Sequence, residues 1–119
     1  MSYITQAQSF AQAWVDSWNS HDLDRIMSHY ADDFQMTSPF IATLMNESTG
    51  TLQGKETVRA YWAKALERIP DLHFDIIEVL AGVDSITVYY HAVLGKRAAE
   101  VLFLNGDGKV SRAIAHYNS

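Results

Sequence analysis

The stretch Trp14–Phe34, WVDSWNSHDLDRIMSHYADDF, decides the fold class of this chain. Its two tryptophans stand four positions apart and continue an apolar stripe that starts upstream, which predicts a first helix. The polar residues 19–22 break that helix and supply caps for a second one over 23–30, whose apolar positions recur at i, i+3, i+4 and i+7. Paired aspartates end the second helix and lead into an alternating strand over 34–38.

Outward from that stretch, glycines and prolines divide the remainder of the chain. Residues 40–54 contain two glycines and predict a loop or lid with a short ordered piece. A third helix is expected over 55–69, because its apolar residues share one side and a proline follows it. Turn residues then separate four predicted strands, over 72–81, 85–94, 99–104 and 109–118. This order predicts one α+β domain over residues 1–119, with three helices packed on a bent mixed or antiparallel sheet.

Composition narrows the class of protein and of partner. The 119 residues are 48% apolar and 19% charged, which is typical of a globular domain. With a net charge of −5 and no cluster of Lys and Arg, the chain is not expected to bind nucleic acid. No apolar run reaches the length of a membrane span, and the first residues lack the pattern of a signal peptide. The absence of cysteine fits a reducing compartment, so we expect a cytoplasmic protein.

The predicted strands carry apolar residues at both alternating sets of positions. Ile86, Val88 and Tyr90 occupy one side of their strand, while Tyr89 and His91 occupy the other. An antiparallel sheet with one face in water normally alternates apolar and polar residues. Because three helices can cover only one face, we expect the other face to meet a second copy of the chain in a homodimer.

Several short segments occur in an order and spacing that resembles the NTF2-like superfamily, and within it the SnoaL-like and ketosteroid isomerase-type domains. They are Asn19-Ser20-His21-Asp22-Leu23-Asp24, Tyr30-Ala31-Asp32-Asp33, Ser38-Pro39, Val58-Arg59-Ala60-Tyr61-Trp62 and the segment 103–110. The similarity extends from Phe10 to Asn118. It implies a cone-shaped, cystatin-like fold whose apolar pocket takes a small hydrophobic molecule.

The same resemblance argues against isomerisation of ketosteroids. That family uses an aspartate just before a proline as its general base, and Ser38 holds the matching place here. A serine does not take a proton from carbon at neutral pH without a partner base. The family's oxyanion hole pairs a tyrosine with a protonated acid, and the matching positions are Trp14 and Glu100. An indole N–H donates one hydrogen bond but is not a phenol.

Glu100 and His91 are the candidates for acid–base chemistry. Glu100 lies in an otherwise apolar strand, so it either faces the pocket, where burial would raise its pKa, or pairs with Lys96 or Arg97 in water. A tight turn at Lys96-Arg97 would place His91 opposite Leu102, and therefore diagonal to Glu100 on the same face. The alternative for His91 is a core or interface histidine, and a one-residue change in the turn reverses its facing.

The other four histidines are weaker candidates. His21 and His29 are expected to be structural or exposed, His73 could face either way, and His116 is assigned to the dimer face. No two histidines have the spacing of metal ligands, and the chain contains no phosphate loop or dinucleotide fingerprint. We therefore expect neither a metal nor a cofactor.

Ten further residues, mainly aromatic or aliphatic, are expected to line the pocket: Trp14, Tyr30, Met36, Ser38, Tyr61, Trp62, Tyr89, Leu102, Ala115 and Tyr117. Such a pocket suits a flat hydrophobic molecule. One hypothesis is a cofactor-free isomerase, cyclase or dehydratase that uses Glu100 and His91 for proton transfer. The other is a non-catalytic ligand-binding or dimerisation module. A protein-transport adaptor, like the superfamily's namesake, is disfavoured because nothing indicates a peptide groove.

Overall fold

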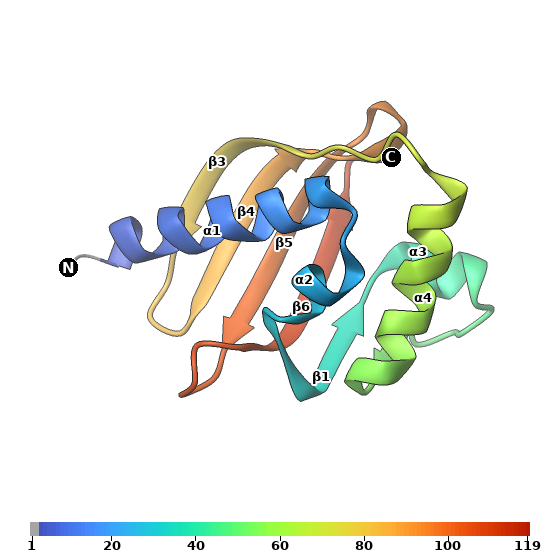
Figure 1. Ribbon diagram of the computed structural model, residues 1–119, viewed down its shortest axis with the longest axis horizontal. Coiled ribbons are helices and arrows are strands. Elements are labelled where there is room, and N and C mark those ends of the chain that lie inside the picture. The colour runs from blue at the N-terminus through green and yellow to red at the C-terminus, as the bar shows by residue number, and fades with distance from the viewer. Residues whose placement is uncertain (1–2) are drawn as a thin grey trace.

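The computed structural model describes residues 3–119, which form four α-helices, one 3-10 helix and a six-stranded sheet (Figure 1). Met1 and Ser2, the start of the expected domain, lie outside the described residues. The helices are α1 (Tyr3–Ser20), α2 (Leu23–Met27), α3 (Pro39–Leu44) and α4 (Lys55–Arg68), with the 3-10 turn η1 (Val93–Gly95). The strands are β1 (Tyr30–Thr37), β2 (Thr51–Gln53), β3 (Asp75–Ala81), β4 (Ser85–His91), β5 (Arg97–Leu104) and β6 (Val110–Tyr117).

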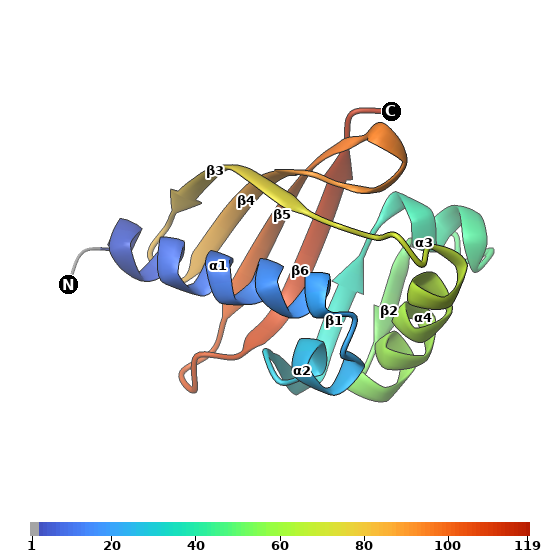
Figure 2. The same ribbon diagram turned by 45° about the horizontal axis from the view of Figure 1, so that its top comes forward.

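The sheet is mixed and open, with the strand order β2-β1-β6-β5-β4-β3. All neighbouring pairs are antiparallel except β1 and β6, which run parallel. Figures 1 and 2 show α1 lying across β3 to β6 on one face, while α3 and α4 lie together at the end formed by β1 and β2. The predicted α+β class is therefore confirmed, and we call the face that α1 covers the inner face.

One helix more than predicted forms, because Pro39 begins a helix where we expected it only to close a strand. Ser38 is the N-cap of α3, and its hydroxyl accepts a hydrogen bond from the backbone N–H of Phe40. Proline suits the first helical position, since its missing N–H would have no partner there. The segment 40–54, expected as a loop or lid with a short ordered piece, consequently contains α3 and β2.

The polar corner between α1 and α2 ties the helices to the sheet. Asp22 caps α2 by accepting from the backbone N–H groups of Asp24 and Arg25. Asn19 makes two hydrogen bonds with the backbone of Phe74, at 3.0 and 2.7 Å, just before β3 begins. The residues that decide the fold class thus also fix the segment that leads into the sheet.

Candidate functional site

Two cross-strand rows on the inner face form the polar centre of the core. Tyr90, Ala98 and Tyr117 pair directly across β4, β5 and β6, and the next row is Val88, Glu100 and Ala115. Ala98 and Ala115 are buried and small, so the two tyrosine rings and the carboxyl group can occupy the space above them. Glu100 consequently lies diagonal to both Tyr90 and Tyr117 on one face.

Glu100 is a buried acid, with only 5% of the residue exposed. The Tyr90 hydroxyl donates a hydrogen bond to its carboxyl oxygen at 2.9 Å. Burial raises the pKa of Glu100 to about 7, and the hydrogen bond from Tyr90 opposes part of that rise. Near neutral pH, part of the Glu100 population is therefore protonated and part of it is ionised.

Three tyrosines surround this carboxyl group. Burial, followed by the charge of Glu100, raises the pKa of Tyr30, Tyr90 and Tyr117 above its ordinary value. The Trp14 indole N–H donates to the Tyr30 hydroxyl at 2.8 Å, and both residues are buried. Trp14 therefore uses its single donor inside the core rather than offering it to a bound molecule.

A cavity of about 410 Å³ opens next to this centre, between α4, α3 and the end of the sheet. We call it the α4 cavity. Its polar lining consists of four hydroxyl side chains and two cationic ones: Ser38, Thr43, Tyr61, Tyr117, Lys64 and Arg68. The remaining lining is apolar or aromatic: Trp18, Met36, Phe40, Leu44, Met45, Trp62, Ala65, Ile69, Leu72, Phe74, Ala92, Val93 and Leu94. A cavity of this size and composition is typical of a small-molecule site.

Trp18 contributes a polar group that the core does not satisfy. Its indole N–H is buried and has no hydrogen-bond partner within residues 3–119. It lies near enough to the Tyr30 hydroxyl to lower the pKa of that tyrosine, yet the two groups do not make a hydrogen bond of normal geometry. A buried donor left in this state costs about 1–3 kcal/mol.

The structure divides the expected pocket residues into three groups. Met36, Ser38, Tyr61, Trp62 and Tyr117 line the α4 cavity. Trp14, Tyr30, Leu102 and Ala115 are buried on the inner side but are not part of its lining, and neither is Glu100. Tyr89 and His91 alternate with Tyr90 and lie on the outer face of the sheet, away from the cavity.

The prediction that His91 and Glu100 are neighbours on one face of the sheet is wrong. His91 is exposed and pairs with Arg97, whereas Val88 pairs with Glu100. The chain does not turn tightly at Lys96-Arg97 but through the wider η1 turn, where Leu94 and Gly95 have positive φ angles of 58° and 71°. The register differs from the expected one by an odd number of residues, so His91 and Tyr89 face the opposite way.

Tyr90 is the hydrogen-bond partner of Glu100 that sequence reasoning missed, because it takes the place expected for His91. Both alternating sets of β4 are apolar or aromatic, so the hydrophobic pattern did not choose between the two faces. The cavity residues of α3 and η1, Leu44, Met45 and Leu94, were also missed. Gly95 was the one available signal of a turn that needs a positive φ.

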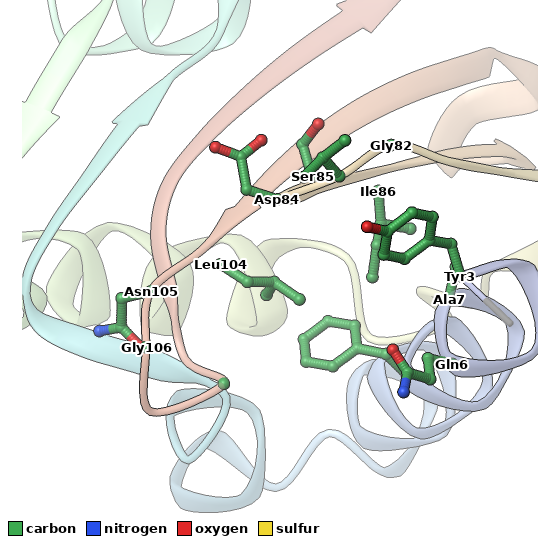
Figure 3. A pocket seen from close by; sticks show the side chains of 13 residues that line it. Tyr3, Gln6, Ala7, Gly82, Asp84, Ser85, Ile86, Leu104, Asn105 and Gly106 are labelled. Atoms are coloured by element: carbon green, nitrogen blue, oxygen red, sulfur yellow. The ribbon is translucent and has the colours of Figure 1, made fainter. Parts of the chain in front are cut away.

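A second hollow, of about 500 Å³, lies at the other end of the molecule, between the start of α1 and the β3–β4 and β5–β6 turns. Figure 3 shows Tyr3 and Gln6 of α1 on one side of it and Leu104 and Asn105 on the other. It contains none of the residues expected at the site. We therefore take the α4 cavity, which adjoins the Glu100 centre through Tyr117, as the candidate functional site.

Comparison with known proteins agrees with this architecture. The sequence profile of the SnoaL-like domain matches residues 11–118. This chain belongs to the SnoaL-like family. No curated protein shows significant sequence similarity to it.

Solved structures of this SnoaL-like protein's relatives include one at high sequence identity. A SnoaL-like protein of unknown function from Burkholderia thailandensis is 51% identical, with a TM-score of 0.93 over 95% of this chain and 94% of that one. A SnoaL-like protein from Agrobacterium tumefaciens, provisionally assigned as an isomerase, is 15% identical with a TM-score of 0.77 over 97% and 99% of the two chains. AclR from Streptomyces galilaeus, provisionally assigned as a hydroxylase, is 18% identical with a TM-score of 0.73 over 98% and 91%. The last two share the fold alone.

Two further observations concern metals and membranes. Within residues 3–119, no group of three or more His, Asp or Glu side chains is arranged to hold a metal ion. No helix in that part of the chain has the length and apolar character needed to cross a bilayer.

Proposed function

We propose that this SnoaL-like protein binds a small, largely apolar molecule in the α4 cavity. The observation that carries the proposal is an apolar, largely aromatic cavity of about 410 Å³ that has a few hydroxyl side chains in its lining. Aromatic side chains supply flat contact surfaces, and a few hydroxyl groups supply orientation. Ser38 and Tyr117 from the sheet end and Tyr61 from α4 are the hydroxyls that would contact the ligand.

Blocking the cavity tests this proposal. Ala65 lines the cavity, and Ala63, on the same helix, is exposed and does not. Ala65→Phe therefore fills part of the cavity, while Ala63→Phe makes the same chemical change outside it. We expect the neutral fluorescent probe N-phenyl-1-naphthylamine to bind the native protein and Ala63→Phe with similar affinity. We expect Ala65→Phe, checked for an unchanged thermal midpoint, to bind at least about tenfold more weakly. Equal binding by all three proteins would exclude the cavity as the site.

A specific observation also supports a second candidate function, acid–base catalysis on a carbonyl compound. Glu100 has a pKa of about 7, and its charge raises the pKa of Tyr117, a residue of the cavity lining. A group with a pKa near the operating pH is suited to proton transfer. Since Glu100 itself is not in the lining, a proton would have to pass through the Tyr117 hydroxyl, or the substrate would have to displace the Tyr117 ring. An isomerase, cyclase or dehydratase without a cofactor would fit this arrangement.

Base-catalysed ring opening of 5-nitrobenzisoxazole tests the second candidate function without requiring the natural substrate. The reaction needs only a base that removes a proton from carbon while an N–O bond breaks. We expect Glu100→Gln and Tyr117→Phe each to lower the rate by about 10²-fold or more, the scale of a general base. His91→Ala serves as the control, because His91 lies exposed on the outer face. Rates that are equal in all four proteins would contradict a role of Glu100 and Tyr117 in proton transfer.

We also propose that two copies of the chain associate through the outer face of the sheet. Apolar side chains on that face come from three neighbouring strands: Tyr89, Val101, Phe103 and Ile114. The edge strand β3 adds Ile77 and Leu80, which are 40% and 58% exposed. Exposed apolar side chains gathered on one face of a sheet are a common feature of protein–protein interfaces.

A further inference from the structure

The α4 cavity differs in charge from the rest of the molecule. The chain has 14 acidic and 9 basic residues, yet the cavity lining contains two cations and no Asp or Glu. Both cations come from α4, where Lys64 and Arg68 are four positions apart. Residues at that spacing are neighbours on the surface of a helix. The mouth of the cavity is therefore positive on an acidic protein.

Neither of these cations has an acidic partner in the part of the chain that the structure describes. The ion pairs of residues 3–119 join Lys55 to Asp32, Arg59 to Asp24 and His73 to Asp75, and none of them includes Lys64 or Arg68. Glu67 lies three positions from Lys64 on α4, but it is outside the cavity lining and makes no ion pair with either cation among residues 3–119. An anion at the mouth would be attracted by both cations. The edge of an apolar cavity also weakens solvent screening, which strengthens the attraction.

The opposite side of the mouth is apolar. Leu44, Met45 and Leu94 line the cavity and are 61%, 43% and 76% exposed. Leu44 and Met45 come from the end of α3, and Leu94 comes from the η1 turn. Deeper in the cavity the lining is aromatic, with Trp18 and Phe74. A molecule in the mouth would meet apolar side chains on one side and positive charge on the other.

We infer that the ligand of the α4 cavity is an apolar molecule that carries one anionic group, such as a carboxylate, held at the mouth by Lys64 and Arg68. The inference rests on the proposed function, because it describes the ligand of the same cavity. The apolar body of the ligand extends inward along the aromatic side chains. Its anionic group stays near the cations at the surface, where it keeps part of its hydration and avoids the cost of burying a charge.

Two probes with the same aromatic body separate the contribution of the charge from that of the apolar contact. N-phenyl-1-naphthylamine is neutral, and 8-anilinonaphthalene-1-sulfonate adds one negative charge to nearly the same skeleton. We expect the native protein to bind the anionic probe about fivefold to tenfold more tightly than the neutral one at low salt, since each exposed charge contact contributes up to about fivefold. In Lys64→Gln/Arg68→Gln this preference should disappear, while the affinity for the neutral probe stays within about twofold. High salt should likewise reduce the preference of the native protein for the anionic probe over the neutral one.

The matched control is Lys55→Gln, which removes one positive charge from the same helix at a residue outside the cavity lining. It should keep the preference of the native protein. If both probes bind equally, or if the preference survives in the Lys64→Gln/Arg68→Gln protein, the inference about the anion is wrong although the cavity still binds apolar molecules. If Ala65→Phe leaves the binding of both probes unchanged, the probes bind elsewhere, and the proposed function fails together with the inference.

Discussion

The Tyr90 hydroxyl donates a hydrogen bond to the Glu100 carboxyl group at 2.9 Å across the inner face of the sheet. The two residues come from neighbouring strands and are diagonal to each other, because Tyr90 pairs with Ala98 and Glu100 pairs with Val88. The pair occupies the place at which the sequence led us to expect His91 beside Glu100. Because the neighbour of this carboxyl group is a tyrosine and not a histidine, its ionisation is controlled mainly by burial, which the hydrogen bond from Tyr90 opposes in part.

Glu100 should make the stability of the protein fall as the pH rises. Burial raises its pKa from 4.5 to about 7, so the folded protein holds a proton that the unfolded chain releases between these values. The stability due to the protonated acid is complete below about pH 4.5 and is lost as the pH rises through about 7. Relative to Glu100→Gln, which stays neutral, the native protein should lose on the order of 3 kcal/mol of unfolding free energy over this window. Urea unfolding at a series of pH values measures the difference.

The exposed Glu56 on α4 supplies a control for this experiment. Glu56→Gln removes the same charge from the surface and should follow the pH profile of the native protein. Parallel profiles for the native protein and Glu100→Gln would show that Glu100 does not hold the extra proton.

The hydrogen bond between Trp14 and Tyr30 should appear as a coupling between the two residues. Trp14→Phe leaves the Tyr30 hydroxyl without its donor at 2.8 Å, and Tyr30→Phe leaves the Trp14 N–H without its acceptor. Each single change should cost more than the lost bond alone, because it leaves a buried polar group unpaired. A double-mutant cycle by urea unfolding should give a coupling of about 1 kcal/mol, with the double variant more stable than the sum of the two single changes predicts. Strict additivity would mean that the bond contributes nothing to stability.

Leu94 in the η1 turn should lower the stability of the folded protein while its side chain contributes to ligand binding. Leu94 has a φ angle of 58°, a conformation that glycine adopts without steric cost, and its side chain lines the α4 cavity. Leu94→Gly should therefore raise the unfolding free energy by about 0.5–1 kcal/mol while it weakens binding of N-phenyl-1-naphthylamine. The neighbouring Gly95 has a φ angle of 71° and open space where a Cβ would lie. Gly95→Ala should destabilise the protein by about 1 kcal/mol through its backbone alone. A destabilised Leu94→Gly would contradict this reading of the turn.

Association through the outer face should depend on its apolar residues. Val101 lies on the outer side of β5, near the middle of the sheet. Val101→Lys should convert a particle of two chains into a single chain in light scattering, since a charge in the middle of an apolar interface is strongly unfavourable. Ala60→Lys, on the exposed side of α4, is the matched control and should leave the mass unchanged. A native protein with the mass of one chain at tens of micromolar would end the dimer proposal.

The features that were predicted correctly and those that were predicted wrongly differ for a physical reason. The helices and the polar corner follow from local signals, because the apolar spacing of α1 and the cap at Asp22 act within a few residues. The pairing of β4 with β5 depends instead on how residues 92–96 turn, and no hydrophobic alternation fixes the register of two strands that are apolar on both faces. Glu100 was found mainly because the family resemblance places an acid at this position, and also because an acid is conspicuous in an apolar strand. Tyr90 was missed because its identity as a partner depends on that register.

The indole resonance of Trp18 gives the most direct test of the central claim, that the α4 cavity receives a small apolar molecule. In ¹⁵N-labelled protein, Trp18→Phe assigns the signal, and titration with N-phenyl-1-naphthylamine reports the surroundings of the N–H. Binding in the cavity should shift the Trp18 indole signal strongly, because this residue belongs to the lining and its N–H has no partner within residues 3–119. The Trp14 signal should move much less, since its N–H is held by Tyr30 at 2.8 Å. A probe that binds while the Trp18 signal stays in place would contradict the claim.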